Sequence, residues 1–203
     1  VDLGGGVIPN EVLTNTASIL QYAGVEGGAD HLVVPRTDTA EVTVAEPSAT
    51  KTLVTTEISD GFNDHTEAVI GELLTYEVTL TPIEGLIPNV LIVDTLDAGM
   101  AFVDCAPIAA SPDLSTNLGV GDFSDLCNPG TNPADNPVIS NNGRTITLDL
   151  GDIINANTDN TTAETLTFQY RVIVLNVSGN QAGTLLNNEA VFEFDNNGSF
   201  TAS

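Results

Sequence analysis

A two-residue alternation of apolar and polar side chains at residues 74–81 constrains the fold of this chain most. The apolar members are Leu74, Tyr76, Val78 and Leu80, and threonines or a glutamate stand between them. This period predicts a β-strand that is packed on one side and solvated on the other. The same alternation recurs at residues 144–150, 166–174 and 190–194, with polar turns between. Because no long helical periodicity appears, the sequence predicts an all-β sandwich.

The charge balance narrows the classes of partner. The 203 residues include 4 Lys and Arg against 28 Asp and Glu, a formal charge of −24. Such a surface repels phosphate backbones and anionic lipids, so we expect no nucleic-acid partner. No apolar run reaches membrane-spanning length, so we expect no membrane insertion by this segment. Scarce lysine and abundant Thr, Asn and Asp are typical of extracellular, cell-surface proteins.

Both cysteines, Cys105 and Cys127, fall in the Pro-, Asn- and Asp-rich segment 105–137, which we interpret as a long loop inserted between strands. We predict a disulfide between them, and two free buried thiols are the alternative. Closing this loop would contribute about 3 kcal/mol in the loop-entropy model.

A short internal repeat suggests how the chain is organised. The pattern Leu-x-Asn-x-Ala occurs at residues 13–17 and again at 186–190. A further strand is expected at residues 40–45 after the first copy, and none after the second. Residues 1–47 are therefore interpreted as the last strands of a preceding module, or a donor-strand segment. Residues 48–203 are interpreted as the next module without its final strand.

An incomplete sandwich would leave an open edge that some strand must fill. One occupant is residues 40–47 of a neighbouring copy, added as a strand. A second interpretation is that the same segment folds back within its own chain. A third is that a tandem array has been cut out of phase. In the first interpretation, the donated strand contains Val42 and Val44 and lies beside Phe192 and Phe194.

Three segments carry a resemblance to a known family: residues 50–52, 71–80 and 89–103. They resemble the conserved Ig-like tandem repeat of bacterial and archaeal surface proteins, a domain of unknown function (the type numbered eleven). Asp97 departs from that pattern, which usually has proline there, and the 105–137 insertion is long. The resemblance implies an Ig-like β-sandwich that is a structural or adhesive module and not an enzyme.

Related surface-protein sandwiches join a first-strand lysine to a last-strand asparagine by an isopeptide bond, helped by a buried carboxylate. This resemblance implies Lys51 and Asn188 as the two partners. Glu77 is a candidate carboxylate, but its strand alternation places it on the face opposite Tyr76. The alternative is that Lys51 is an ordinary solvated lysine.

Oxygen-rich turns make calcium the expected cofactor, if there is one, since carboxylates and carbonyls suit this cation. The candidate ligands are Asp60, Asp64, Asp152, Asp159 and Asp195. Ordinary Asx turns are the alternative for each of them. Glycosylation-type triplets begin at Asn160, Asn176 and Asn197.

No nucleophile motif or Cys/His pairing is present, so we expect no enzyme. The leading hypothesis is a structural module of an extracellular surface array or filament. It would assemble head-to-tail by strand sharing with copies of itself or adjacent repeats. The alternative is a calcium-dependent adhesion module that binds a glycan or a protein through its loops.

Overall fold

The structure, a computed structural model, describes residues 11–58, 66–119, 122–127, 136–158, 161–195 and 198–202. The chain divides into two units, Val1–Glu46 and Pro47–Ser203. Among the described residues no helix is long and apolar enough to cross a membrane.

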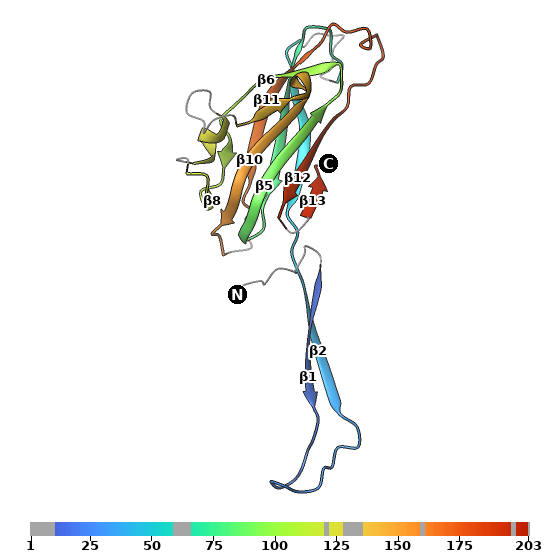
Figure 1. Ribbon diagram of the computed structural model, residues 1–203, viewed down its shortest axis with the longest axis vertical. Helices are drawn as coiled ribbons and strands as arrows, with labels where there is room; N and C mark the ends of the chain where they lie inside the picture. The colour runs from blue at the N-terminus through green and yellow to red at the C-terminus, as the bar shows by residue number, and fades with distance from the viewer. Residues whose placement is uncertain are drawn as a thin grey trace. The chain divides into compact units, whose positions relative to one another are not determined.

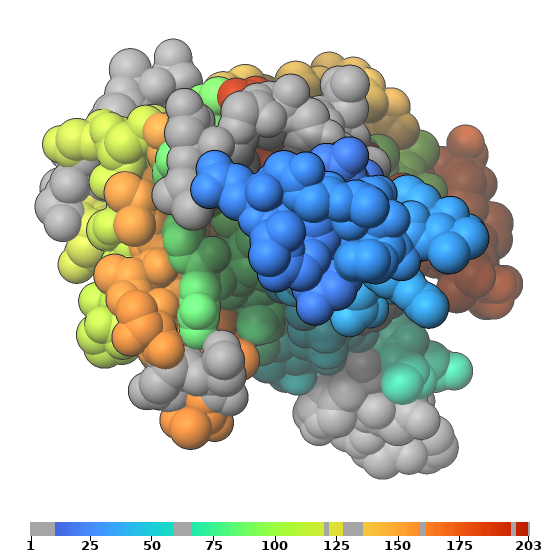
Figure 2. Space-filling model, turned by 90° about the horizontal axis from the view of Figure 1, so that it is seen from below, coloured from blue at the N-terminus to red at the C-terminus, as the bar shows by residue number. Residues whose placement is uncertain are grey.

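The first unit is a two-stranded antiparallel ribbon of β1 (Val12–Ile19) and β2 (Arg36–Thr43) (Figure 1). The two strands pair along their full length, from Val12 opposite Thr43 to Ile19 opposite Arg36. Every residue of β2 is exposed, and Figure 2 shows the surface of this unit in blue. A ribbon that buries so little apolar surface is at best marginally stable by itself in water.

The second unit is an all-β sandwich of two antiparallel sheets, which confirms the predicted fold class. One sheet has the order β13-β12-β5-β10-β8, with β9 paired to β10 (Figure 1). The other has the order β3-β4-β11-β6, with β7 paired to β11.

The strands of this unit have the following bounds: β3 Ser48–Thr56, β4 Leu73–Thr81, β5 Gly85–Leu96, β6 Met100–Cys105, β7 Ala109–Ala110, β8 Leu114–Thr116, β9 Val138–Ser140, β10 Thr145–Asn155, β11 Leu166–Val174, β12 Asn188–Phe194 and β13 Gly198–Thr201. Two short 3-10 helices, η1 (Phe123–Cys127) and η2 (Asn141–Gly143), lie in the connections.

The core is built from the inward positions of the alternating strands. In β4 and β11 every second residue is buried, as the sequence period predicts. The opposite sheet contributes its own inward side chains from β5, β10 and β12 to the same cluster. Fully buried members of the two sheets include Val78, Phe168, Val172, Ile92, Leu148 and Phe192.

Gly151 interrupts the regular pairing of β10 with β5 at a register shift. Its φ of 65° lies in the left-handed region that favours glycine. A Cβ there would lie 2.4 Å from Asn117 Oδ1, so this bulge requires glycine.

Two elements differ from the sequence-based expectation. The segment around Gly85 and Pro88, expected as a turn, is the beginning of the twelve-residue strand β5. A final strand, β13, follows β12 and pairs with it, whereas the sequence predicted no strand at this position.

Candidate functional site

Three polar side chains occupy inward positions among the apolar residues of the sandwich. Lys51, the only lysine of the chain, alternates in β3 with Ala49 and Leu53, which pack in or against the core. Asp94 follows Ile92 at the same phase in β5, and its side chain is 0% exposed. Asn188 begins β12, two residues before the buried Ala190. The strand period therefore places all three on core-facing sides.

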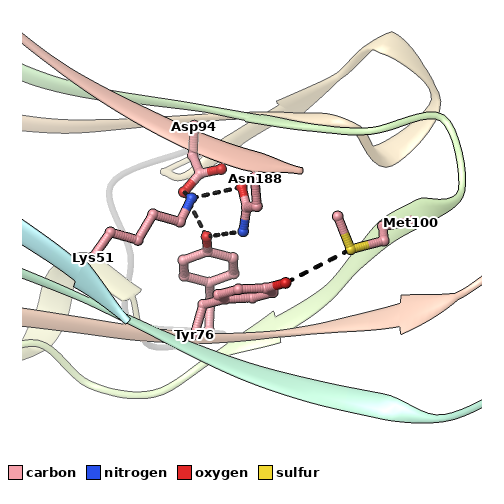
Figure 3. Close-up of polar contacts among 6 residues, drawn as sticks. Lys51, Tyr76, Asp94, Met100 and Asn188 are labelled. Carbon is pink, nitrogen blue, oxygen red and sulfur yellow. Dashed lines mark hydrogen bonds and ion pairs between the residues drawn. The ribbon is translucent and has the colours of Figure 1, made fainter. Parts of the chain in front are cut away.

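The lysine reaches both other groups. Its Nζ lies 2.5 Å from Asp94 Oδ2 and 2.5 Å from Asn188 Oδ1 (Figure 3). Asp94 is opposite Ala190 in the β5–β12 pairing, so the aspartate and the asparagine are diagonal neighbours within one sheet. Lys51 comes from the other sheet, and only 6% of its side chain is exposed.

A tyrosine fixes the orientation of the asparagine amide. The Tyr170 hydroxyl donates to Asp94 Oδ2 at 2.5 Å. It also accepts a hydrogen bond from Asn188 Nδ2 at 2.9 Å. Since the amide nitrogen is bound to this hydroxyl, the amide oxygen is turned toward the lysine.

Aromatic rings form the wall of the site. Lys51 Nζ lies 5.5 Å from the ring centroid of Tyr76 and 5.7 Å from that of Tyr170. The two rings are stacked with centroids 5.9 Å apart, and Phe168 stacks on Tyr170 at 5.1 Å. These rings exclude water from the amine, and their faces still attract it when it is charged.

Burial acts on the two ionisable groups in opposite directions. Desolvation lowers the pKa of Lys51 to about 8, although the charge of Asp94 opposes the shift. Desolvation likewise raises the pKa of Asp94, against the opposing effect of Lys51. Both shifts favour the uncharged forms, an amine beside a protonated carboxyl group. Asp94 Oδ1 is buried without a hydrogen-bond partner among the described residues, which adds to the cost of a charged carboxylate.

The arrangement has the parts needed for amide exchange. An uncharged lysine amine can attack the amide carbon of asparagine, forming a new C–N bond and releasing ammonia. One proton must leave Nζ and one must reach the departing Nδ2 nitrogen. Asp94 contacts Nζ, and Tyr170 bridges Asp94 to Nδ2, so a hydrogen-bonded route joins both ends of this transfer.

The structure thus brings together two sequence-predicted residues, Lys51 and Asn188, with two that the sequence reasoning missed. Glu77, considered as the carboxylate, points away from the site and accepts a hydrogen bond from Gln169 Nε2 at 2.6 Å. The carboxylate at the site is Asp94. Its signal was available, because Asp94 and Tyr170 each continue the period of buried residues in their strands.

Two of the predicted calcium ligands, Asp152 and Asp195, lie in the described part of the chain, and both accept hydrogen bonds from Asn89. Asp152 accepts hydrogen bonds from the Asn89 backbone and from Asn117 Nδ2, at 2.9 and 2.7 Å. Asp195 accepts from Asn89 Nδ2 at 2.5 Å. Among the described residues no group of three or more His, Cys, Asp and Glu could hold a metal ion. Asp60, Asp64 and Asp159 lie outside the described residues, and calcium binding stays a prediction.

Cys105 and Cys127 are joined by a disulfide with their Cα atoms 6.1 Å apart. Asn176 is exposed after the end of β11. Asn160 and Asn197 lie outside the described residues, and glycosylation of all three stays a prediction.

The residues expected to share strands lie in different environments. Val42 is 63% exposed on β2, and Val44 donates its backbone N–H to the Glu11 carbonyl at 2.8 Å. Phe192 is fully buried in β12, and Phe194 packs against the core. The chain's own β13 pairs with β12 beside these phenylalanines. Strand sharing between copies stays a prediction.

No protein-family model matches the chain, and no curated protein matches it. A solved structure with a similar fold is the C-terminal domain of the AgI/II polypeptide BspA from Streptococcus agalactiae, with a TM-score of 0.51 and 14% identity. That match covers 83% of this chain and 52% of the other.

The full-length major pilin SpaD from Corynebacterium diphtheriae matches with a TM-score of 0.44 and 15% identity, over 79% of this chain and 35% of the pilin. The chain therefore spans about a third to a half of the length of these two proteins. At such identities the likeness concerns the fold.

Proposed function

We propose that this chain is a structural module of an extracellular surface array or filament, and that an isopeptide bond between Lys51 and Asn188 closes its sandwich. The observation that carries the proposal is the position of Lys51 Nζ, 2.5 Å from both the Asp94 carboxyl and the Asn188 amide oxygen. Each chain forms the bond once, so the site is not an enzyme's active site. The bond that forms there makes the folded sandwich more stable.

The location of the bond suits a load-bearing role. Lys51 belongs to β3, the first strand of the sandwich unit, and Asn188 to β12, near its end. A covalent link here also crosses between the two sheets. The acidic surface and the Cys105–Cys127 disulfide are consistent with an oxidising extracellular location.

Intact mass of the purified, reduced chain tests the bond. We expect a mass below the sequence mass by one ammonia, and a digest containing a branched peptide that links Lys51 to Asn188. Lys51→Arg and Asn188→Ala should each retain the full mass. Asn176→Ala, at an exposed asparagine, is the matched control and should still lose ammonia. An unmodified wild-type chain would disprove the covalent part of the proposal.

Assembly is expected to proceed through the β1–β2 ribbon, which carries exposed apolar side chains such as Val42 and Ile19. Addition of this ribbon to a neighbouring copy would bury them and extend a sheet. Sedimentation over a range of concentrations should therefore show association. Val42→Asp should abolish it, while Thr39→Asp, on the opposite face of the ribbon, should not. A wild-type chain that stays monomeric throughout the range would count against assembly by this route.

A further inference from the structure

The first strand of the ribbon repeats the reactive strand of the sandwich. The shared pattern places Leu13, Asn15 and Ala17 of β1 at the positions of Leu186, Asn188 and Ala190. Two residues further along, Ile19 takes the position of Phe192, which is fully buried in the core. Asn15 is therefore the counterpart of the asparagine that Lys51 contacts.

The ribbon also divides into two unlike faces. The pairing sets Leu13 opposite Val42, Asn15 opposite Ala40, Ala17 opposite Asp38 and Ile19 opposite Arg36. These residues share one face, on which β1 contributes apolar side chains around a central asparagine and β2 contributes the charged pair Asp38 and Arg36 at one end. The other face is formed by threonines, Ser18, Val12 and Glu41, with a hydrogen bond from Thr14 to Glu41. This is the inward and outward pattern of β12, where Asn188 and Phe192 face the core and Glu189 and Glu193 do not.

The edges of β1 and β12 differ in one respect. β12 is paired on both edges, with β13 and with β5. Among the described residues β1 is paired on one edge only, with β2. β2 takes the place that β13 has beside β12. The open edge of β1 is thus the one that β12 uses to join β5, the strand that carries Asp94.

We infer that the ribbon supplies the last two strands of another sandwich module, and that Asn15 accepts an isopeptide bond from an inward-facing lysine of that module. The inference rests on the proposed Lys51–Asn188 chemistry. The partner is a sandwich that lacks strands equivalent to β12 and β13 and holds a lysine and a carboxyl group in the places of Lys51 and Asp94. The interface it offers is the one already seen between β12 and β5.

The chemical step balances as in the intramolecular case. The uncharged lysine amine of the partner forms a bond to the amide carbon of Asn15, and the bond from that carbon to Nδ2 breaks. The amine loses one proton, and the departing nitrogen gains it to leave as ammonia. The partner's carboxyl group transfers this proton, so no oxidant or activating cofactor is needed.

A fusion that contains the whole sandwich unit provides the test. Residues 47–184 are duplicated directly ahead of Val12, so that β1 follows the duplicate as β12 follows the native module. The duplicate then supplies a Lys51 and an Asp94 without an Asn188 of its own. We expect the fusion to lose two ammonias and to yield a peptide that links Lys51 of the duplicate to Asn15. Asn15→Ala should lose one, and Thr14→Ala, on the outward face, should still lose two.

Trypsin cleavage after Arg36 reports whether the ribbon has docked, because this residue is exposed on β2 in the chain by itself. Loss of one ammonia with rapid cleavage at Arg36 would overturn the docking. Loss of one ammonia with protection of Arg36 would overturn the reactive role of Asn15. If neither ammonia is lost, the proposed Lys51–Asn188 bond fails as well, and the unfused chain will show this independently.

Discussion

Asp94 lies where a carboxylate is hardest to keep charged, with no exposed surface and one oxygen without a partner among the described residues. We predict that Asp94→Asn keeps the shape of the site but stops isopeptide formation, because an amide cannot pass a proton from Nζ toward Nδ2. The variant should retain the full sequence mass after days of incubation. Glu77→Gln, on the outward face of β4, is the matched control and should lose ammonia as the wild type does. Normal bond formation in Asp94→Asn would remove Asp94 from the mechanism.

The lowered pKa of Lys51 also predicts how stability depends on pH in a chain that cannot form the bond. In Asn188→Ala, Lys51 of the unfolded chain keeps its proton up to about pH 10.5, whereas the folded chain releases it near its pKa of about 8. Between these values the unfolded state binds more protons, so the free energy of unfolding rises with pH.

We expect a rise of up to about 2 kcal/mol between about pH 8 and about pH 9.5, below the ordinary range of tyrosine ionisation. Denaturant unfolding at several pH values measures it. The double variant Lys51→Met, Asn188→Ala should show a flat profile over the same window. A fall in the single variant would contradict the lowered pKa of Lys51.

The sequence predicts the inward residues of the site better than their chemistry. Alternation in β4 and β11 correctly placed Tyr76 and Tyr170 in the core. Asp94 is in phase with Ile92 and Leu96 in β5, but a charged side chain is rarely buried unless it is paired, so the alternation alone does not predict a buried carboxyl group. Burial of this charge is tolerated only because Lys51 and Tyr170 reach it from the other sheet, and contacts of such sequence separation leave no local signal.

At the scale of secondary-structure elements, the disulfide ties the inserted segment to the sandwich at the end of β6. We predict that the double variant Cys105→Ser, Cys127→Ser lowers the free energy of unfolding by about 3 kcal/mol, because its unfolded chain is no longer constrained by the 22-residue link. Denaturant unfolding in the Asn188→Ala background measures this effect without the second cross-link. An unchanged midpoint would show that the disulfide does not contribute to stability.

The ends of the strands were predicted least accurately from the sequence, and tertiary pairing explains why. Gly85 and Pro88 indicate a turn, yet β5 extends through them because β10 pairs with it as far as Gly85. β13 is four residues long and contains one large apolar side chain, Phe200, so it shows no alternation. Its pairing with β12 and the stacking of Phe200 on Phe192, with centroids 5.2 Å apart, define it instead.

At the scale of the whole molecule, a bond from Lys51 to Asn188 divides the chain into a part that carries force and a part that does not. The two residues are 137 positions apart and close a loop that contains most of the sandwich. A force applied at the chain ends passes through the covalent bond and leaves this loop unstretched. Without the bond, the same force would unfold the sandwich and extend the loop.

We therefore predict that single-molecule stretching of the wild-type chain shows no extension from the enclosed residues. Asn188→Ala should show an unfolding event that lengthens the chain by roughly 390 Å, the extended length of the 137 positions that separate the two residues less the 22 that the Cys105–Cys127 disulfide closes off. Asn176→Ala, which leaves the site intact, should behave like the wild type. An equally long extension in the wild type would mean that β3 and β12 are held together by hydrogen bonds and packing alone, and the load-bearing role proposed for the site would be lost.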